Sequence, residues 1–133
     1  MEKTLPTQPL VSIVITTKNE ERNIGICLQS IGNQTYKNIE IIVVDNFSTD
    51  HTQEISKKFT NKVFSKGPER SAQRNYGMVD IAQGEYVMYI DADMILSPNL
   101  IEACMNRIKA GDCHALHIRE TVLGANFWSK VRR

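Results

Sequence analysis

The stretch Val11-Ser12-Ile13-Val14-Ile15-Thr16 decides the fold of this 133-residue chain. Its residues are almost all apolar and β-branched, and polar positions do not alternate with apolar ones. A strand of this composition is typical of a parallel sheet that is covered by helices on both faces. Further strands are expected at 39–44, 62–65, 86–90 and 115–118.

Helical patterns separate these strands. Ile24, Cys27, Leu28 and Ile31 recur at helical spacing, which predicts the buried face of a helix that ends near Gly32. Strands that alternate with helices in this way predict an α/β fold, in which helices flank a mostly parallel sheet and the crossovers are right-handed.

Three more helices follow from local signals. Asp50 with Gln53 three residues later resembles a capping box for a helix through Phe59. A second helix is expected at 70–82. A third, at 97–111, begins with Ser-Pro, since serine suits an N-cap and proline the first helical position.

Composition sets limits on function. Sixteen Lys and Arg against fifteen Asp and Glu leave a net charge of +1, which does not favour nucleic acid as a partner. The length fits one domain over 1–133 with a polar lead-in at 1–9. The first ten residues hold no apolar segment for a signal peptide, and the three cysteines lack disulfide or metal spacing. We therefore expect a cytoplasmic protein, with association at a membrane surface left open.

Polar side chains gather where the predicted strands end. In an open parallel sheet, ligands bind beyond the carboxyl ends of the strands. The residues at these ends are Thr16, Lys18 and Glu20 after the first strand, Asp45 and Asn46 after the second, and Asp91 and Asp93 after the fourth. They are distant in sequence, but the predicted fold brings them to one edge of the sheet.

Asp91 and Asp93 are the candidate metal ligands. In an extended segment, residues i and i+2 point to the same side, so both carboxylates would face one way with Ala92 turned out. Two such charges in a cleft repel, and a divalent cation relieves the repulsion. Mg²⁺ or Mn²⁺ on one or two carboxylates takes its other ligands from substrate phosphates and water. Because a chain with six Asp contains such a triplet by chance in about a quarter of cases, its place after a buried strand carries the argument.

Other residues at this edge have two interpretations each. Asp45 is either a turn former or, with Asn46, a nucleoside-binding residue. Arg70 and Arg74, on the helix before the fourth strand, either reach a base or a diphosphate, or one of them is only solvated. The three histidines show no partner pattern and are expected to be structural. The sequence contains no dinucleotide-binding fingerprint, P-loop or nucleophile elbow.

Four segments together resemble the family 2 glycosyltransferases of GT-A fold. They are VSIVITTKNEE at 11–21, NIEIIVVDNFSTDHT at 38–52, ERSAQRNYG at 69–77 and GEYVMYIDADMILSPNLI at 84–101. They cover nearly the whole chain, in the family's order and spacing. The resemblance implies a Rossmann-like GT-A sandwich that binds a nucleotide-sugar.

The resemblance implies a nucleoside pocket between the first two strand ends. Thr16, Lys18 and Glu20 would line this pocket, and Lys18 stands where the family commonly has an aromatic residue. Asp45 and Asn46 match an acidic pair that contacts uracil and ribose. Asparagine at the second position keeps hydrogen bonding but loses the charge.

The resemblance also implies a diphosphate and metal site. Arg70 and Arg74 match the basic segment that precedes the Asp-x-Asp strand. Asp91 would hold the ribose or the sugar, and Asp93 would bind the metal directly.

The implied reaction is displacement at the anomeric carbon of a nucleotide-sugar, UDP-linked by preference, by an acceptor hydroxyl of a glycan, lipid or protein. Mn²⁺ or Mg²⁺ is the implied cofactor, and a carboxylate is the implied base. The family's base lies well downstream, and the only acids after Asp93 are Glu102, Asp112 and Glu120, none of which matches it. The base is therefore unknown, and the chain resembles a donor-binding half truncated before its acceptor half.

Two other functions remain open. A non-catalytic nucleotide-sugar-binding module would act with a partner chain or as a homo-oligomer. A nucleotidyltransferase has a similar sheet and acidic site, but it usually needs a Gly-rich basic loop after the first strand, where only Lys18 is present.

Overall fold

The computed structural model describes residues 8–111 and 113–121. The chain divides into two compact units, Met1–Glu102 and Ala103–Arg133. The elements in chain order are β1 (Val11–Thr17), α1 (Ile24–Gly32), β2 (Ile39–Asp45), α2 (Thr52–Ser56), β3 (Val63–Ser65), α3 (Arg70–Asn75), the π-helix η1 (Tyr76–Ile81), β4 (Tyr86–Asp91) and α4 (Leu100–Lys109).

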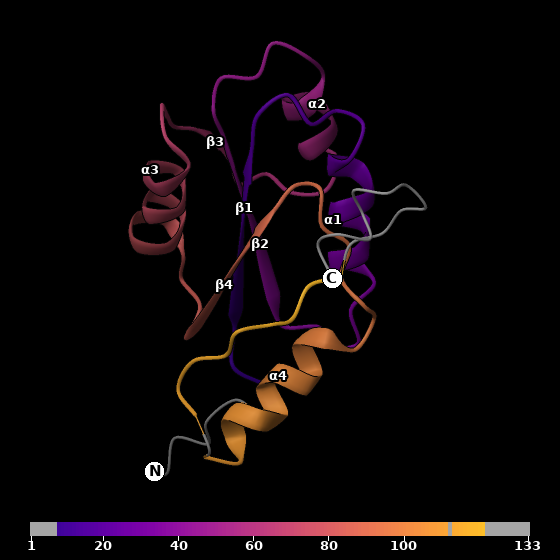
Figure 1. The fold of residues 1–133 in the computed structure, drawn as a ribbon, viewed down its shortest axis with the longest axis vertical. Coiled ribbons are helices and arrows are strands. Elements are labelled where there is room, and N and C mark those ends of the chain that lie inside the picture. Colours follow the sequence, from indigo (N-terminus) through magenta and orange to yellow (C-terminus); the bar gives the residue numbers. More distant parts are fainter. Residues whose placement is uncertain (1–7, 112, 122–133) are drawn as a thin grey trace. The chain divides into compact units, whose positions relative to one another are not determined.

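The four strands form one parallel sheet in the order β3-β2-β1-β4 (Figure 1). β1 lies between β2 and β4, and its seven residues are all buried, as its apolar sequence predicts. At the end of β1, Thr17 pairs with Asp45 of β2, and Thr16 pairs with Asp91 of β4. The predicted α/β fold with a parallel sheet is confirmed.

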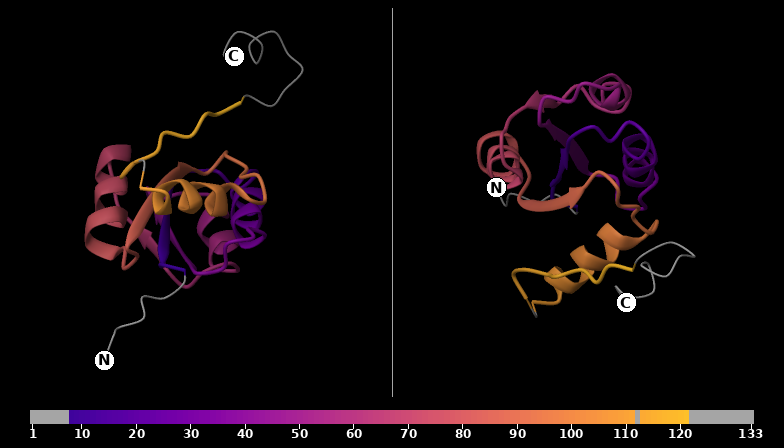
Figure 2. Two further views of the ribbon diagram at one scale, coloured as in Figure 1. Left: turned by 90° about the horizontal axis from the view of Figure 1, so that it is seen from below. Right: turned by 45° about the horizontal axis from the view of Figure 1, so that its top comes forward.

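Helices cover both faces of this sheet. α1 and α2 lie on one face, and α3 with η1 lies on the other (Figures 1 and 2). The predicted inner face of α1 is confirmed, because Ile24, Cys27, Leu28 and Ile31 are all buried. On the opposite face, a Cβ at Gly77 would lie 2.4 Å from Cγ1 of Val14, so only glycine lets η1 approach the sheet this closely.

The predicted helix at 70–82 is confirmed as α3 followed without a break by η1, but α2 and α4 differ from prediction in their starts. In α2, Gln53 donates to Asp45 rather than turning back toward Asp50, so the predicted capping box is not formed. α4 begins at Leu100, whose backbone amide donates to the Ser97 carbonyl at 3.1 Å. That carbonyl also accepts a hydrogen bond from Gln34, and the Pro98 carbonyl accepts one from Thr35.

The predicted strand at 115–118 is wrong. A β-strand needs a hydrogen-bonded neighbour, and within 8–111 and 113–121 no strand pairs with these residues, which have no regular structure. The lead-in at 1–9 lies mostly outside the described residues, although the carbonyl of Pro9 accepts a hydrogen bond from the Tyr36 hydroxyl. In the part of the chain that the structure describes, no helix is long and apolar enough to cross a bilayer.

Candidate functional site

The order in which the strands are added to the sheet reverses between β1 and β4. From β1 the chain passes through α1 to β2 and then to β3 on one side, and it returns through α3 and η1 to β4 on the other side. Open α/β sheets bind ligands at such a switch point, beyond the carboxyl ends of the two strands. The residues that end these strands are Thr16 and Thr17 in β1 and Asp91 in β4.

Asp91 is the centre of this switch point. Its Oδ1 accepts hydrogen bonds from the Thr16 hydroxyl at 3.1 Å and from Nη2 of Arg74 at 3.3 Å. Its Oδ2 lies 3.3 Å from Nη1 of Arg70. Arg74 also stands over the ring of Tyr89, 4.5 Å from its centroid. The structure therefore brings together four of the residues that the sequence singled out, and it joins them through one carboxylate.

Ala92 and Asp93 do not continue the strand. They form a turn that is closed by a 3.2 Å bond from the Met94 amide to the Asp91 carbonyl, and Ala92 is 2% exposed. The expectation of an extended triplet with Ala92 turned out is therefore wrong. The sequence pattern fixes the spacing of the two acids, whereas the turn that follows the strand decides where their side chains point.

Asp93 is exposed, and it makes no hydrogen bond or ion pair with any residue of 8–111 or 113–121. Its charge acts on Cys27 of α1. Burial raises the pKa of the Cys27 thiol to about 12, and the negative charge of Asp93 adds to this effect. Asp93 is thus the acid at this edge whose oxygens are available to a cation, while Asp91 is already engaged.

Asp45 is fully buried, and its carboxylate accepts hydrogen bonds from neighbouring residues of the same chain segment. Oδ2 accepts hydrogen bonds from the Ser48 amide at 2.8 Å and from Nε2 of Gln53 at 2.7 Å, and Oδ1 accepts one from the Ser48 hydroxyl. These bonds are those of a turn former. Asn46 is 9% exposed, and its Nδ2 donates to the Pro68 carbonyl at 2.7 Å.

Gln73 is a residue that sequence reasoning missed. It is buried on α3, and its Nε2 donates to the carbonyls of Thr17 at 3.1 Å and Val44 at 2.8 Å. The helix that carries Arg70 and Arg74 is thereby held to the ends of β1 and β2. A glutamine on the inner face of the predicted helix was the available signal, because buried amides need partners.

Lys18 and Glu20 lie in the loop after β1. Lys18 is exposed and has no hydrogen bond or ion pair within the described part of the chain. Glu20 is half-buried, and its Oε2 accepts a 2.8 Å bond from Asn23. The structure therefore leaves the Lys18 ammonium free to meet a ligand, and it keeps Glu20 at the start of α1.

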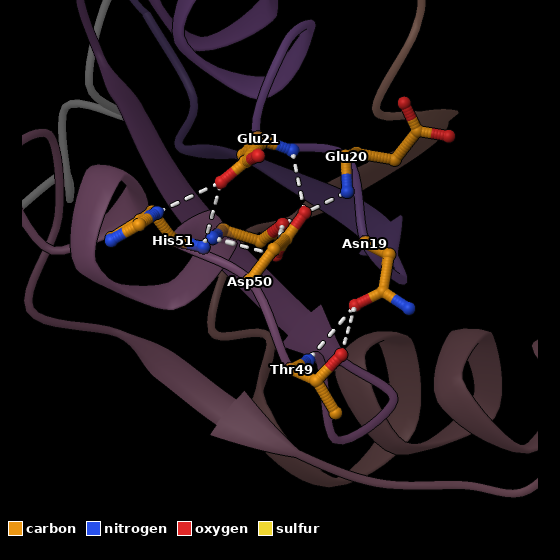
Figure 3. Close-up of polar contacts among 7 residues, drawn as sticks. Asn19, Glu20, Glu21, Thr49, Asp50 and His51 are labelled. Carbon is orange, nitrogen blue, oxygen red and sulfur yellow. Dashed lines mark hydrogen bonds and ion pairs between the residues drawn. The ribbon is translucent and has the colours of Figure 1, made fainter.

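A second set of contacts fixes this loop against the loop after β2, and we call residues 19–21 together with 48–52 the loop latch (Figure 3). Three of its bonds run from backbone amides of residues 19–21 to side chains of the other loop: Asn19 to Ser48, Glu20 to Thr52 and Glu21 to Asp50. In the other direction, the Thr49 backbone amide donates to the Asn19 side chain, and the backbone and ring of His51 bond to the Glu21 carboxylate. The expectation that His51 is structural agrees with this arrangement.

Of the three downstream acids, Glu102 belongs to the first unit, where it binds a residue outside the switch point. Glu102, in the first turn of α4, accepts a 3.0 Å hydrogen bond from the Thr35 hydroxyl. Glu120 is exposed in the second unit, and Asp112 lies outside the described residues. No catalytic base is assigned among them.

Comparison with known proteins agrees with this geometry. Residues 12–132 match the family described as glycosyl transferase family 2. Glycosyltransferase GlyG of Streptococcus pneumoniae is 36% identical over 111 residues, which are 77% of this chain and 36% of GlyG. The cholesterol galactosyltransferase of Borreliella burgdorferi is 38% identical over 106 residues, which are 75% of this chain and 29% of that enzyme.

A solved structure shows the same fold. Glucosyl-3-phosphoglycerate synthase of Mycobacterium tuberculosis, in complex with Mn²⁺, UDP and glucosyl-3-phosphoglycerate, has a TM-score of 0.67 at 23% identity, over 78% of this chain and 41% of that one. The chain thus spans about a third of the length of the two relatives named above. With a matching family over nearly all its residues and a GT-A-type sheet, the chain belongs to glycosyl transferase family 2.

Proposed function

We propose that this chain is the donor-binding part of a glycosyltransferase. It binds a nucleotide-diphosphate sugar, UDP-linked, together with Mn²⁺ or Mg²⁺, and the sugar passes to an acceptor hydroxyl. The observation that carries the proposal is the convergence of Thr16, Arg70 and Arg74 on Asp91 at the switch point of the sheet. Basic side chains next to an acid at this position suit a diphosphate and its cation together.

The arginines bind the diphosphate by exchanging partners. Arg70 and Arg74 each reach Asp91 at 3.3 Å, and side-chain exposures of 66% and 31% keep both accessible to solvent. An entering diphosphate offers them more negative charge than one carboxylate does, and guanidinium groups bind phosphate oxygens in a fork geometry. Asp91 is released from the arginines when they turn to the diphosphate.

The acids present fit a magnesium or manganese ion. Carboxylate oxygens suit these cations, and one or two of them suffice when phosphates complete the coordination. Asp93, exposed and without a hydrogen bond or ion pair within 8–111 and 113–121, is the proposed direct ligand, with Asp91 beside it. Within these same residues, no cluster of three or more His, Cys, Asp or Glu forms an all-protein site, so the phosphates have to contribute. When bound, the cation supplies positive charge to the leaving diphosphate.

The nucleoside lies toward the ends of β1 and β2 in this proposal. Lys18 offers a free ammonium in the loop after β1, with Thr16 in the strand before it and Glu20 in the same loop after it. Asn46 would contact the nucleoside through its small exposed surface. Asp45 contributes by holding the 45–48 turn in shape, because all its hydrogen bonds are made within the protein.

The reaction is a displacement in which the acceptor oxygen bonds to the anomeric carbon and the bond from that carbon to the diphosphate breaks. The acceptor, a glycan, lipid or protein, and the base that takes its proton are proposed to come from outside the described residues, either from the rest of a longer protein or from a partner chain. The site would work in the cytoplasm, where nucleotide-sugars are met in solution or at the membrane surface.

Thermal unfolding with UDP tests this proposal. We expect UDP to raise the Tm in the presence of Mn²⁺ but not in its absence, because a ligand at about 100 times its Kd stabilises a fold by roughly 2.7 kcal/mol. Asp93→Ala should abolish the rise. Asp80→Ala, which removes an exposed acid from η1, should keep it and serves as the matched control.

The possible results separate the alternatives. No metal-dependent rise with any nucleoside diphosphate would contradict donor binding of every kind. A rise without hydrolysis or transfer of a UDP-sugar would favour a non-catalytic module that needs a partner chain. Hydrolysis or transfer by the chain itself would exclude that module.

A further inference from the structure

Phe47 occupies a position in the loop after β2 that the proposed function does not explain. Its φ is +50°, in the left-handed region of the backbone, and its side chain is 65% exposed. A bulky residue in this conformation is uncommon, because its Cβ crowds the following carbonyl. Glycine or asparagine adopts the same backbone with much less strain. The position therefore carries a strained backbone and a large apolar ring in water.

The residues on either side hold this conformation in place. Before it, Nδ2 of Asn46 donates to the Pro68 carbonyl at 2.7 Å. After it, the Ser48 amide donates to Asp45 at 2.8 Å, and the Ser48 hydroxyl also binds that buried carboxylate. The ring of Phe47 makes no ring contact in the part of the chain that the structure describes. The loop thus presents the ring outward from a fixed support.

The loop that carries Phe47 lies at the edge of the sheet where the proposed nucleotide has its base. The backbone amide of Asn46 donates to the Thr17 carbonyl at 2.9 Å, so the chain still lies beside β1 one residue before Phe47. From β4 to β2 the sheet spans two strand spacings, on the order of 10 Å. A nucleoside diphosphate has its base and its diphosphate at opposite ends of a ribose. With the diphosphate at Asp91, the base therefore extends toward the loop after β2.

We propose that the Phe47 ring is a stacking platform for the base of the bound nucleotide. The inference rests on the proposed function, and it adds a residue that recognises the nucleobase face without reading its edge. Base–aromatic stacking accepts any nucleobase, because every base has a π-face. Phe47 would thus strengthen nucleotide binding, while the polar groups of the 16–20 and 45–46 loops select among nucleotides.

Three variants and two ligands test this role. Phe47→Asn keeps a residue suited to left-handed backbone but removes the ring, and Phe47→Tyr keeps the ring. Phe59→Asn is the matched control, since Phe59 is a second exposed phenylalanine, 42% accessible, in the turn after α2. Binding of UDP and of inorganic pyrophosphate, each with Mg²⁺, is measured by calorimetry, and the Tm of each variant is recorded.

The expected pattern is specific to the ring. Phe47→Asn should weaken UDP binding about fivefold to a hundredfold and leave pyrophosphate binding unchanged, with a Tm no lower than that of the wild type. Phe47→Tyr and Phe59→Asn should bind UDP as the wild type does. Unchanged UDP binding by Phe47→Asn, or an equal loss for UDP and pyrophosphate, would overturn the inference.

The wild-type measurements separate this inference from the proposed function. A wild type that binds pyrophosphate as tightly as UDP would overturn the platform and leave the diphosphate site standing. A wild type that binds neither ligand would overturn both.

Discussion

The Thr16 hydroxyl donates a 3.1 Å hydrogen bond to Oδ1 of Asp91. The two residues pair near the carboxyl ends of neighbouring strands and are 75 positions apart in the sequence. The same oxygen accepts a bond from Arg74, and the other carboxylate oxygen lies near Arg70. One carboxylate thus links both strands of the switch point to α3.

The two arginines on Asp91 should differ in their effect on stability. Arg74→Ala removes a half-buried ion pair and the contact with the Tyr89 ring, and we expect it to lower the free energy of unfolding by about 1 kcal/mol. Arg70→Ala removes a more exposed pair, and we expect a loss below about 0.5 kcal/mol. Urea unfolding measures both, and equal losses would contradict the different roles.

Asp45 should matter more for folding than any exposed acid. Asp45→Ala leaves the Ser48 amide, the Ser48 hydroxyl and Nε2 of Gln53 without their buried acceptor. We expect a loss of roughly 2–4 kcal/mol in the free energy of unfolding. Asp80→Ala should change it by less than about 0.5 kcal/mol. Similar values for the two variants in urea would show that the 45–48 turn does not depend on its carboxylate.

The pair of Glu21 and His51 gives the loop latch a dependence on pH. Hydrogen bonds from the backbone and ring of His51 lower the pKa of Glu21 from 4.5, and the hydrogen bond with Glu21 raises the pKa of His51 from 6.5. The carboxylate's contribution to stability is complete above pH 4.5 and is lost as the pH falls through its lowered pKa. The imidazole's contribution is complete below pH 6.5 and is lost as the pH rises through its raised pKa. The latch is therefore strongest between these two values.

An NMR titration of the His51 ring checks this coupling. In Glu21→Gln, the His51 pKa should fall back toward 6.5, because the charged partner is gone. An unchanged His51 titration in the variant would mean that the pair does not form in solution.

The sequence predicted the sheet well because its strands are decided by local composition. The apolar runs that contain Ile13 and Val43 are too hydrophobic to be anything but buried, and helices covering both faces follow from that. The same reasoning failed at 115–118, where a short apolar run met no partner strand in the described residues. Pairing depends on what lies beside a segment in space, which composition does not reveal.

The sequence predicted that several of the named residues would lie close together, but it did not predict their contacts. Periodicity placed Thr16, Arg74 and Asp91 near one edge, and the structure joins them. Periodicity could not show that the Asp45 carboxylate accepts hydrogen bonds from its own loop and from α2, because these bonds depend on where Ser48 and Gln53 lie in space. The spacing of Asp45 and Ser48, three residues apart, was the signal for a side-chain-capped turn.

The most direct test of the account is equilibrium dialysis of the chain against UDP, with Mn²⁺ and with a chelator. The account predicts stoichiometric retention of UDP with Mn²⁺ and at least roughly tenfold weaker retention with the chelator, because the exposed Asp93 and the nearby Asp91 hold the diphosphate through the cation. Retention that does not depend on the metal, or no retention at all, would contradict a metal-linked diphosphate site at the switch point between β1 and β4.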